Sequence, residues 1–199
     1  TYLITNAEKI YQKVHFYIPF YQRKRIKEQP SVEREYDALL FGYNRIGYSL
    51  LKSLRKLSSR SLVIDFNPET IAMLKRKKIP AVYADAESTD FLEQLHLKKV
   101  KLTISTIPSQ ETNLLLLEKI RERNKEAILI VLAHQIKDAL ELYKKGAAYV
   151  ILPHLLGGEY ASKILEQFGT QRSKYKENKE KHMHQLKERL REGHEGQRR

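Results

Sequence analysis

Hydrophobic and polar positions follow two alternating periods over residues 36–169 of the 199-residue chain. Short continuous apolar runs predict buried strands at 36–42, 61–68, 81–86, 101–108, 127–133 and 148–153. Between them, apolar residues at three- and four-residue spacings predict amphipathic helices at 45–57, 69–78, 88–97, 109–124, 136–146 and 156–169. Apolar strands separated by helices indicate a six-stranded parallel sheet with helices on both faces. We therefore expect a doubly wound, Rossmann-like α/β fold.

The first predicted strand runs into a glycine turn with the sequence FGYNRIGYSLL. Gly42 and Gly47 match two glycines of a phosphate-binding turn, one for the tight turn and one for packing of the helix on the strand. Asn44 stands between them, where bare backbone normally approaches phosphate, so its amide either donates to a phosphate or obstructs a pyrophosphate. The Arg45 guanidinium matches phosphate oxygens. The alternative is a tight turn without a ligand.

Two acids follow at the ends of the next two predicted strands. Asp65 comes 23 residues after Gly42, where an acid meets a ribose hydroxyl in dinucleotide-binding sheets. Asp85 ends the third strand on the same carboxyl edge, and ligands of open α/β sheets bind along that edge. Either acid is also compatible with a turn or a helix cap, and Asp65 precedes Asn67-Pro68.

With the glycine turn, the segments LVIDFNPE, AVYADAES and LTISTIPSQETN stand in an order and spacing that resembles a known family. These are the RCK or TrkA-N domains, the regulatory nucleotide-binding domains of potassium channels and transporters. The chain is most similar to the domains at the C-terminus of Kef-type cation:proton antiporters. The later segment LELYKKGAAYVILPHLLGGEYASKIL fits the same family, so the resemblance covers residues 36–169.

The resemblance implies a domain on the cytoplasmic face of the cell membrane that regulates potassium or cation transport and is not an enzyme. It implies an adenine nucleotide as ligand, AMP or NAD(H) first and ATP or ADP next. It also implies an attached transmembrane antiporter domain and pairing with a second copy as a homodimer. The matching positions comprise the phosphate turn, the ribose acid, the adenine-side acid and the end of the fourth strand: Gly42, Asn44, Arg45, Gly47, Asp65, Asp85 and Thr106.

The last predicted helix carries an apolar stripe at three- and four-residue steps, formed by Tyr160, Ile164, Leu165 and Phe168. We expect this stripe to contribute to the contact between two copies. The alternative is that it packs on the domain's own sheet.

The two ends of the chain concentrate its net charge of +13. Residues 1–35 hold seven Lys and Arg against four Asp and Glu, and residues 171–199 hold ten against five. A nucleic-acid binder would show a basic face on its folded body, so nucleic acid is not an expected partner. The ends are instead expected to be solvated or membrane-facing, with residues 170–199 forming a charged tail that is helical or disordered.

The N-terminal segment 1–35 has six of the chain's 18 Phe and Tyr within its first 21 residues, and the basic cluster 23–27 follows directly. Aromatic rings beside a basic cluster are typical of a chain that leaves a membrane. An amphipathic helix packed on the domain would show the same pattern. The family resemblance favours the first interpretation, a membrane-proximal linker before the domain at 36–169.

Two rival functions remain open. An NAD-dependent oxidoreductase needs a general acid or base and a substrate pocket from a second domain, which the residues after 169 cannot build. His134 is the strongest candidate for chemistry because it follows a strand at the ligand edge, but no serine or lysine pairs with it in the sequence, so no catalytic residue is predicted. A stand-alone soluble regulatory subunit of a potassium channel would differ only in how the membrane part is joined. The chain has no cysteine, and no metal site is expected.

Overall fold

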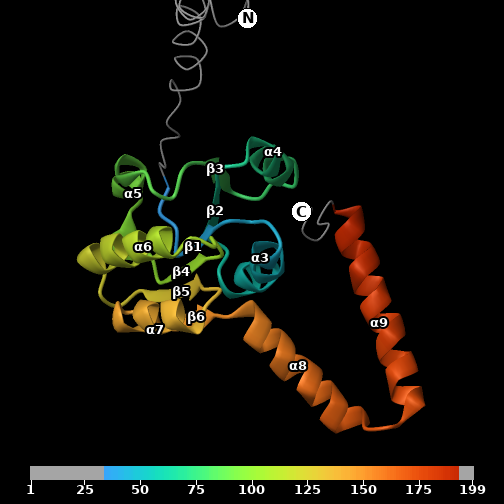
Figure 1. Ribbon diagram of the computed structural model, residues 1–199. Helices are drawn as coiled ribbons and strands as arrows, with labels where there is room; N and C mark the ends of the chain where they lie inside the picture. The colour runs from blue at the N-terminus through green and yellow to red at the C-terminus, as the bar shows by residue number, and fades with distance from the viewer. Residues whose placement is uncertain (1–33, 193–199) are drawn as a thin grey trace, which may run out of the picture. The chain divides into compact units, whose positions relative to one another are not determined.

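The computed structural model describes residues 34–192, so nearly all of the expected linker lies outside the described residues. Its centre is a single six-stranded sheet (Figure 1). The strands are β1 (Ala38–Phe41), β2 (Ser61–Asp65), β3 (Ala81–Tyr83), β4 (Leu102–Ser105), β5 (Ile128–Leu132) and β6 (Tyr149–Ile151).

The strands lie in the order β3-β2-β1-β4-β5-β6, and every neighbouring pair is parallel. The register places Phe41 beside Ile64 on one side and beside Ser105 on the other. Successive strands are thus added on one side of β1 as far as β3 and then on its other side from β4 onward. Ligands of such sheets bind where this order changes, between β1 and β4, at the carboxyl ends of the strands. The predicted doubly wound parallel fold is confirmed.

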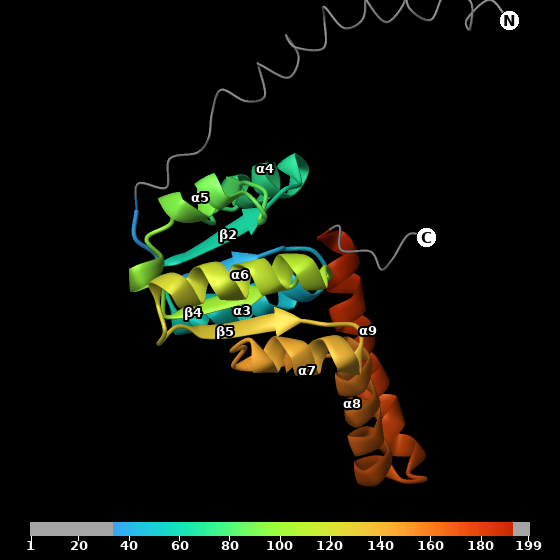
Figure 2. The ribbon, with the colours of Figure 1, turned by 60° about the vertical axis from the view of Figure 1, so that its left-hand side comes forward.

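Helices cover both faces of the sheet (Figures 1 and 2). The connections β1–β2 and β2–β3 place α3 (Ile46–Leu57) and α4 (Pro68–Arg76) on one face. After β3 the strands are added in the opposite direction across the sheet, so right-handed connections pass over the opposite face. That face carries α5 (Thr89–Gln94), the 3-10 turn η1 (Leu97–Lys99), α6 (Gln110–Arg123) and α7 (Ile136–Lys144).

The core lies between the sheet and these helices. All residues of β1 and β2 are buried, which explains why their sequences are continuously apolar rather than alternating. Leu54 of α3 and Leu74 of α4 pack into the same core. The predicted cap at Ser109 is confirmed, because its side chain accepts a hydrogen bond from the Thr112 amide.

β3 is shorter than the predicted strand 81–86. Its pairing with β2 ends at Tyr83, and Ala84 makes one further hydrogen bond, from its amide to the Asp65 carbonyl. The chain then turns, because the Asp85 carbonyl and carboxylate accept hydrogen bonds from the amides of Ser88 and Glu87. Asp85 therefore lies in the loop after β3, still at the carboxyl edge.

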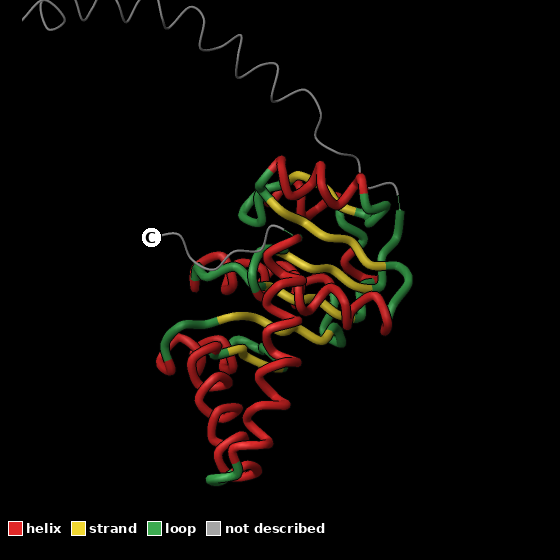
Figure 3. The backbone as a smooth tube through the Cα atoms, turned by 90° about the vertical axis from the view of Figure 1, so that its right-hand side faces the viewer, coloured by secondary structure: helices red, strands yellow, loops and turns green. Residues whose placement is uncertain are grey.

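Two further helices, α8 (Pro153–Phe168) and α9 (Arg172–Arg191), follow β6 (Figure 3). They are joined at their turn by an edge-on contact of the Phe168 and Tyr175 rings, whose centroids are 5.2 Å apart. Neither helix has a buried residue. Within the described chain the predicted stripe on α8 is therefore not packed on the sheet.

Within residues 34–192, no helix combines the length and the apolar character needed to span a membrane.

Candidate nucleotide-binding site

The two glycines of the turn between β1 and α3 occupy positions that exclude a side chain. Gly42 has φ +81°, and a Cβ there would lie 2.7 Å from the Thr106 hydroxyl. A Cβ at Gly47 would lie 2.2 Å from the carbonyl oxygen of Gly42. The start of α3 is thus packed directly on the turn, as the sequence predicts for these two glycines.

The residues between the glycines leave the start of α3 open. Arg45 is exposed and has φ +53°, and no side chain caps the helix. The Asn44 side-chain oxygen accepts a hydrogen bond of 2.8 Å from the Arg45 amide, while the Gly47 amide donates to the Asn44 carbonyl. The start of α3 therefore lies at the carboxyl edge without a side-chain cap, and the positive end of the helix dipole there favours an anion.

Asp65 ties the end of β2 to the turn. Its buried carboxylate accepts a hydrogen bond of 2.8 Å from the Tyr43 amide and another of 2.8 Å from the Asn67 amide. A carboxylate has about four acceptor positions, so two of them remain after these contacts. Asp65 is therefore placed both to order the turn and to accept hydrogen bonds from a ligand hydroxyl.

Thr106 closes the turn from the side of β4. Its hydroxyl donates to the Gly42 carbonyl at 3.0 Å, and its amide donates to the Phe41 carbonyl at 2.9 Å. The structure thus brings Gly42, Gly47, Asp65 and Thr106 together around the turn, with Asn44 and Arg45 exposed on it. The exposed Asp85 makes its side-chain hydrogen bond within its own loop.

Tyr43, at the centre of the turn, is buried among these residues. Burial raises the pKa of its hydroxyl to about 12, and the nearby charge of Glu192 and the Tyr48 side chain act in the same direction. Its ring meets the Tyr48 ring edge-on, with the centroids 6.1 Å apart. The turn therefore packs on the pair of Tyr43 and Tyr48 rings, whose hydroxyls remain neutral at physiological pH.

The sequence did not single out Glu87 or Asn113, which join neighbouring parts of the same edge. The Thr112 hydroxyl donates to the Glu87 carboxylate at 2.6 Å and so connects the loop after β3 with the first turn of α6. The fully buried Asn113 donates from its amide nitrogen to the carbonyls of Ile107 and Leu132. Their only signal in the sequence is a polar residue in a loop or first helical turn, which many positions share.

His134 and His154 follow β5 and β6 and are exposed, with ring centroids 6.4 Å apart. Residues 34–192 contain no group of three or more His, Cys, Asp or Glu arranged to hold a metal ion.

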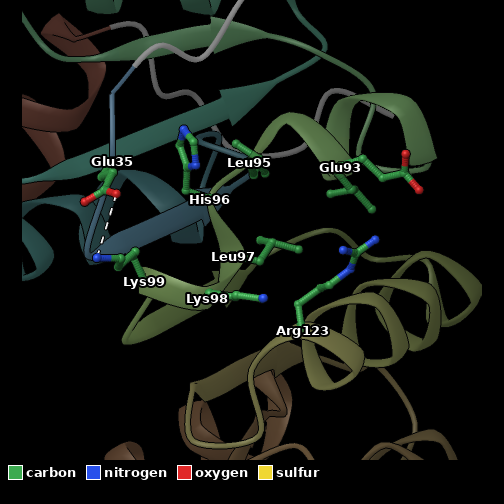
Figure 4. Close-up of a pocket in the computed structure, with 9 residues that line it drawn as sticks. Glu35, Glu93, Leu95, His96, Leu97, Lys98, Lys99 and Arg123 are labelled. Carbon is green, nitrogen blue, oxygen red and sulfur yellow. Dashed lines mark ion pairs between the residues drawn. The ribbon is translucent and has the colours of Figure 1, made fainter.

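A cavity of about 260 Å³ lies at the opposite, amino-terminal edge of the sheet (Figure 4). It is lined by the loop through His96 and Lys98, by Arg123 at the end of α6, and by Glu35, whose carboxylate is 3.9 Å from the Lys99 ammonium. Because the glycine turn lies at the carboxyl edge, this cavity is separate from the candidate nucleotide site.

The model of the TrkA-N domain family matches residues 38–153. The chain belongs to the TrkA-N domain family. The match begins at β1 and extends through β6, so it includes the glycine turn, Asp65, Asp85 and Thr106. The resemblance on which the sequence interpretation rested is confirmed.

Relatives of this TrkA-N domain include transport proteins. Potassium channel protein 1 of Methanocaldococcus jannaschii is 23% identical over 165 residues, which cover 82% of this chain and 49% of that protein. The glutathione-regulated potassium-efflux system protein KefC of Escherichia coli is 27% identical over 120 residues, which cover 60% of this chain and 18% of KefC. The chain thus spans about half the length, or less, of these relatives.

Solved structures share the fold. The TrkA-N domain of the inner membrane protein ybaL from Escherichia coli has a TM-score of 0.58 and 27% identity, covering 68% of this chain and 98% of that one. The Kef CTD of Shewanella denitrificans in its AMP-bound form has a TM-score of 0.56 and 17% identity, covering 74% and 91%. The GsuK channel bound to NAD has a TM-score of 0.53 and 18% identity, covering 73% and 27%.

Proposed function

We propose that the chain is a regulatory domain that binds an adenine nucleotide at the glycine turn and passes its state to a cation transport protein. The observation that carries this proposal is the Asp65 carboxylate bound to the Tyr43 amide beside the open start of α3. In this proposal the turn after β1 is the anion site, and Asp65 at the end of the neighbouring strand β2 accepts hydrogen bonds from the ribose hydroxyls. AMP and NAD in two proteins of the same fold support this class of ligand.

Each candidate residue has a role in this proposal. The phosphate lies at Gly42, Gly47 and the exposed Arg45, and the ribose meets Asp65. Thr106 positions the turn, and Asp85 faces the adenine side. Asn44 favours a ligand with one phosphate, AMP, over a dinucleotide. Its side-chain oxygen already accepts the hydrogen bond of the Arg45 amide, which is then not available to a second phosphate.

The regulated protein is a Kef-type cation:proton antiporter that is joined to the domain through residues 1–35, and the domain works as a homodimer at the cytoplasmic face of the membrane. The 27% identity to KefC over 120 residues supports this partner. The domain catalyses no reaction. A second candidate is the regulatory domain or subunit of a potassium channel, which is favoured by the longer match, 82% of the chain, to a potassium channel protein.

Calorimetry with AMP, ADP, ATP, NAD and NADH tests the proposed ligand class. At least one of these ligands should bind. Asp65→Ala should weaken that ligand by about 1–3 kcal/mol, since a hydroxyl of the ligand loses its acceptor. Absence of heat and of a thermal shift with all five ligands would contradict the proposal.

Asp65 also orders the turn, so a second ligand isolates its contact with the ribose. For the unsubstituted chain, the 2′,3′-dideoxy form of the bound nucleotide should bind more weakly than the parent nucleotide. For Asp65→Ala, the two ligands should bind equally. If the variant still distinguishes them, another residue holds the ribose.

A further inference from the structure

The helix α9 carries an apolar stripe that no other described part of the chain covers. Met183, Leu186 and Leu190 are 42%, 48% and 56% exposed, and their three- and four-residue spacing places them on one face of the helix. Large apolar side chains arranged on one face of an exposed helix indicate a contact surface.

A different face of α9 contacts the body of the domain. Arg189 donates to the Ser49 hydroxyl, and its guanidinium lies 5.6 Å from the centre of the Tyr48 ring. Glu192, just after the helix, pairs with Lys77. At 100° per residue, Arg189 lies about a quarter turn from the centre of the stripe. The helix is thus held by polar contacts near its C-terminal end, while its apolar stripe remains exposed to solvent.

The stripe is flanked by positive charge. Helix α9 holds eight Lys and Arg and three Glu between residues 172 and 191. Lys176, Lys179 and Lys187 are exposed and share the face of the stripe, and the three glutamates lie farther round the helix. We call this surface, Lys176, Lys179, Met183, Leu186, Lys187 and Leu190, the basic-apolar face.

We propose that the basic-apolar face binds an anionic lipid membrane, with α9 lying along the surface. The methionine and leucine side chains enter the headgroup region, while the lysine stems extend and place their ammonium groups among the lipid phosphates. A second copy is a poor occupant of this face, because the lysines of the two helices would meet. This binding does not depend on a nucleotide, so it stands apart from the proposed function.

Co-sedimentation of the whole chain with vesicles tests the proposal. The chain should bind vesicles of phosphatidylcholine and phosphatidylglycerol, and it should remain in solution with phosphatidylcholine alone. The triple variant Lys176→Glu, Lys179→Glu and Lys187→Glu should bind the anionic vesicles at least about tenfold more weakly, since each basic residue near a membrane contributes severalfold to binding.

A matched control removes the same charge elsewhere. Lys56→Glu, Lys75→Glu and Lys144→Glu are exposed positions on α3, α4 and α7. This control should retain binding within about threefold, because charges beyond a Debye length are screened. Leu186→Ser should lower the binding that persists at high salt. Circular dichroism should show unchanged helix content, and a triple Lys→Gln variant replaces the first if it does not.

Four results would overturn the proposal. One is the absence of binding to anionic vesicles, and another is equal binding to phosphatidylcholine alone. The third is an equal loss of binding in the two charge-reversal variants, which would mean that binding follows net charge or residues outside α9. Competition with duplex DNA belongs in the same assay, and displacement of the chain from vesicles at equimolar phosphate would assign the face to nucleic acid instead.

Discussion

At the scale of single residues, Gly47 has less room for a side chain than Gly42, the other glycine of the turn. Gly47→Ala would place a methyl group 2.2 Å from the Gly42 carbonyl oxygen, so α3 must move away from the turn. We expect a loss of about 1–3 kcal/mol in the free energy of unfolding, together with weaker nucleotide binding. Urea denaturation measures the first effect and calorimetry the second.

Gly158→Ala is the matched control, because a Cβ there meets nothing within 4 Å and the residue lies inside the exposed helix α8. It should stabilise the chain by about 0.5–1 kcal/mol. Equal stability of the two alanine variants would show that the contact between Gly42 and Gly47 is not close.

The buried hydroxyl of Tyr43 makes the free energy of unfolding depend on pH. Burial raises the pKa of its hydroxyl from 10.0 to about 12, so the folded state keeps the proton that the unfolded state loses first. The contribution of the protonated Tyr43 hydroxyl to the free energy of unfolding is complete below pH 10 and is lost as the pH rises toward 12. The free energy of unfolding should fall by up to about 1.4 kcal/mol per pH unit in this window.

Tyr43→Phe removes the ionisable group, so its unfolding free energy should fall less steeply between pH 10 and 12 than that of the unsubstituted chain. Urea titrations at several pH values provide the comparison. Parallel curves for the two proteins would mean that the Tyr43 hydroxyl titrates normally.

At the scale of elements, α8 carries the surface that we expect to join two copies. Tyr160 and Leu165 are 65% and 62% exposed, and neither Ile164 nor Phe168 is fully buried. Because the stripe has no cover within the described chain, Ile164→Asp should leave the fold intact and separate a dimer into monomers. Analytical ultracentrifugation and circular dichroism test this expectation.

Ser162→Asp, an exposed position on the far side of α8, should leave the dimer unchanged. A monomeric unsubstituted chain, or an unfolded Ile164→Asp variant, would exclude this helix as the interface between copies.

The sequence predicted some elements better than others for physical reasons. β1 and β2 are buried on both faces, so their apolar runs are unambiguous. β3 pairs with one neighbour over three residues only, and such a short edge strand has no sharp end in the sequence. For the tail, the charged composition left helix and disorder open, and the structure shows a helix over Arg172–Arg191.

At the scale of the whole molecule, the parallel topology made the candidate site predictable. Asp65 is the last residue of β2 and Thr106 follows β4, yet parallel strands bring their carboxyl ends to one edge, next to Gly42. The hydrogen bond from the Tyr43 amide to Asp65 was not predictable, because it depends on the path of the backbone through the turn. The contact of Arg189 with Tyr48 was equally hidden, since 141 residues separate the two in the sequence.

Regulation also belongs to this scale. A nucleotide changes the state of an attached carrier only if it binds two arrangements of the domain with different affinity. The glycine turn contacts α3, and α3 contacts the end of α9 through Tyr48 and Ser49. A ligand at the turn is therefore one element away from the C-terminal helices.

The most direct test of nucleotide binding at the glycine turn is an AMP titration followed by the backbone amide resonances of the whole chain. The amides of Tyr43, Arg45 and Gly47 should shift first and most, since they surround the proposed phosphate site. The amides of Lys98 and Arg123, which line the cavity at the opposite edge, should remain unchanged. Shifts confined to that cavity, or no shifts at the turn under saturating AMP, ADP, ATP, NAD and NADH, would contradict the assignment.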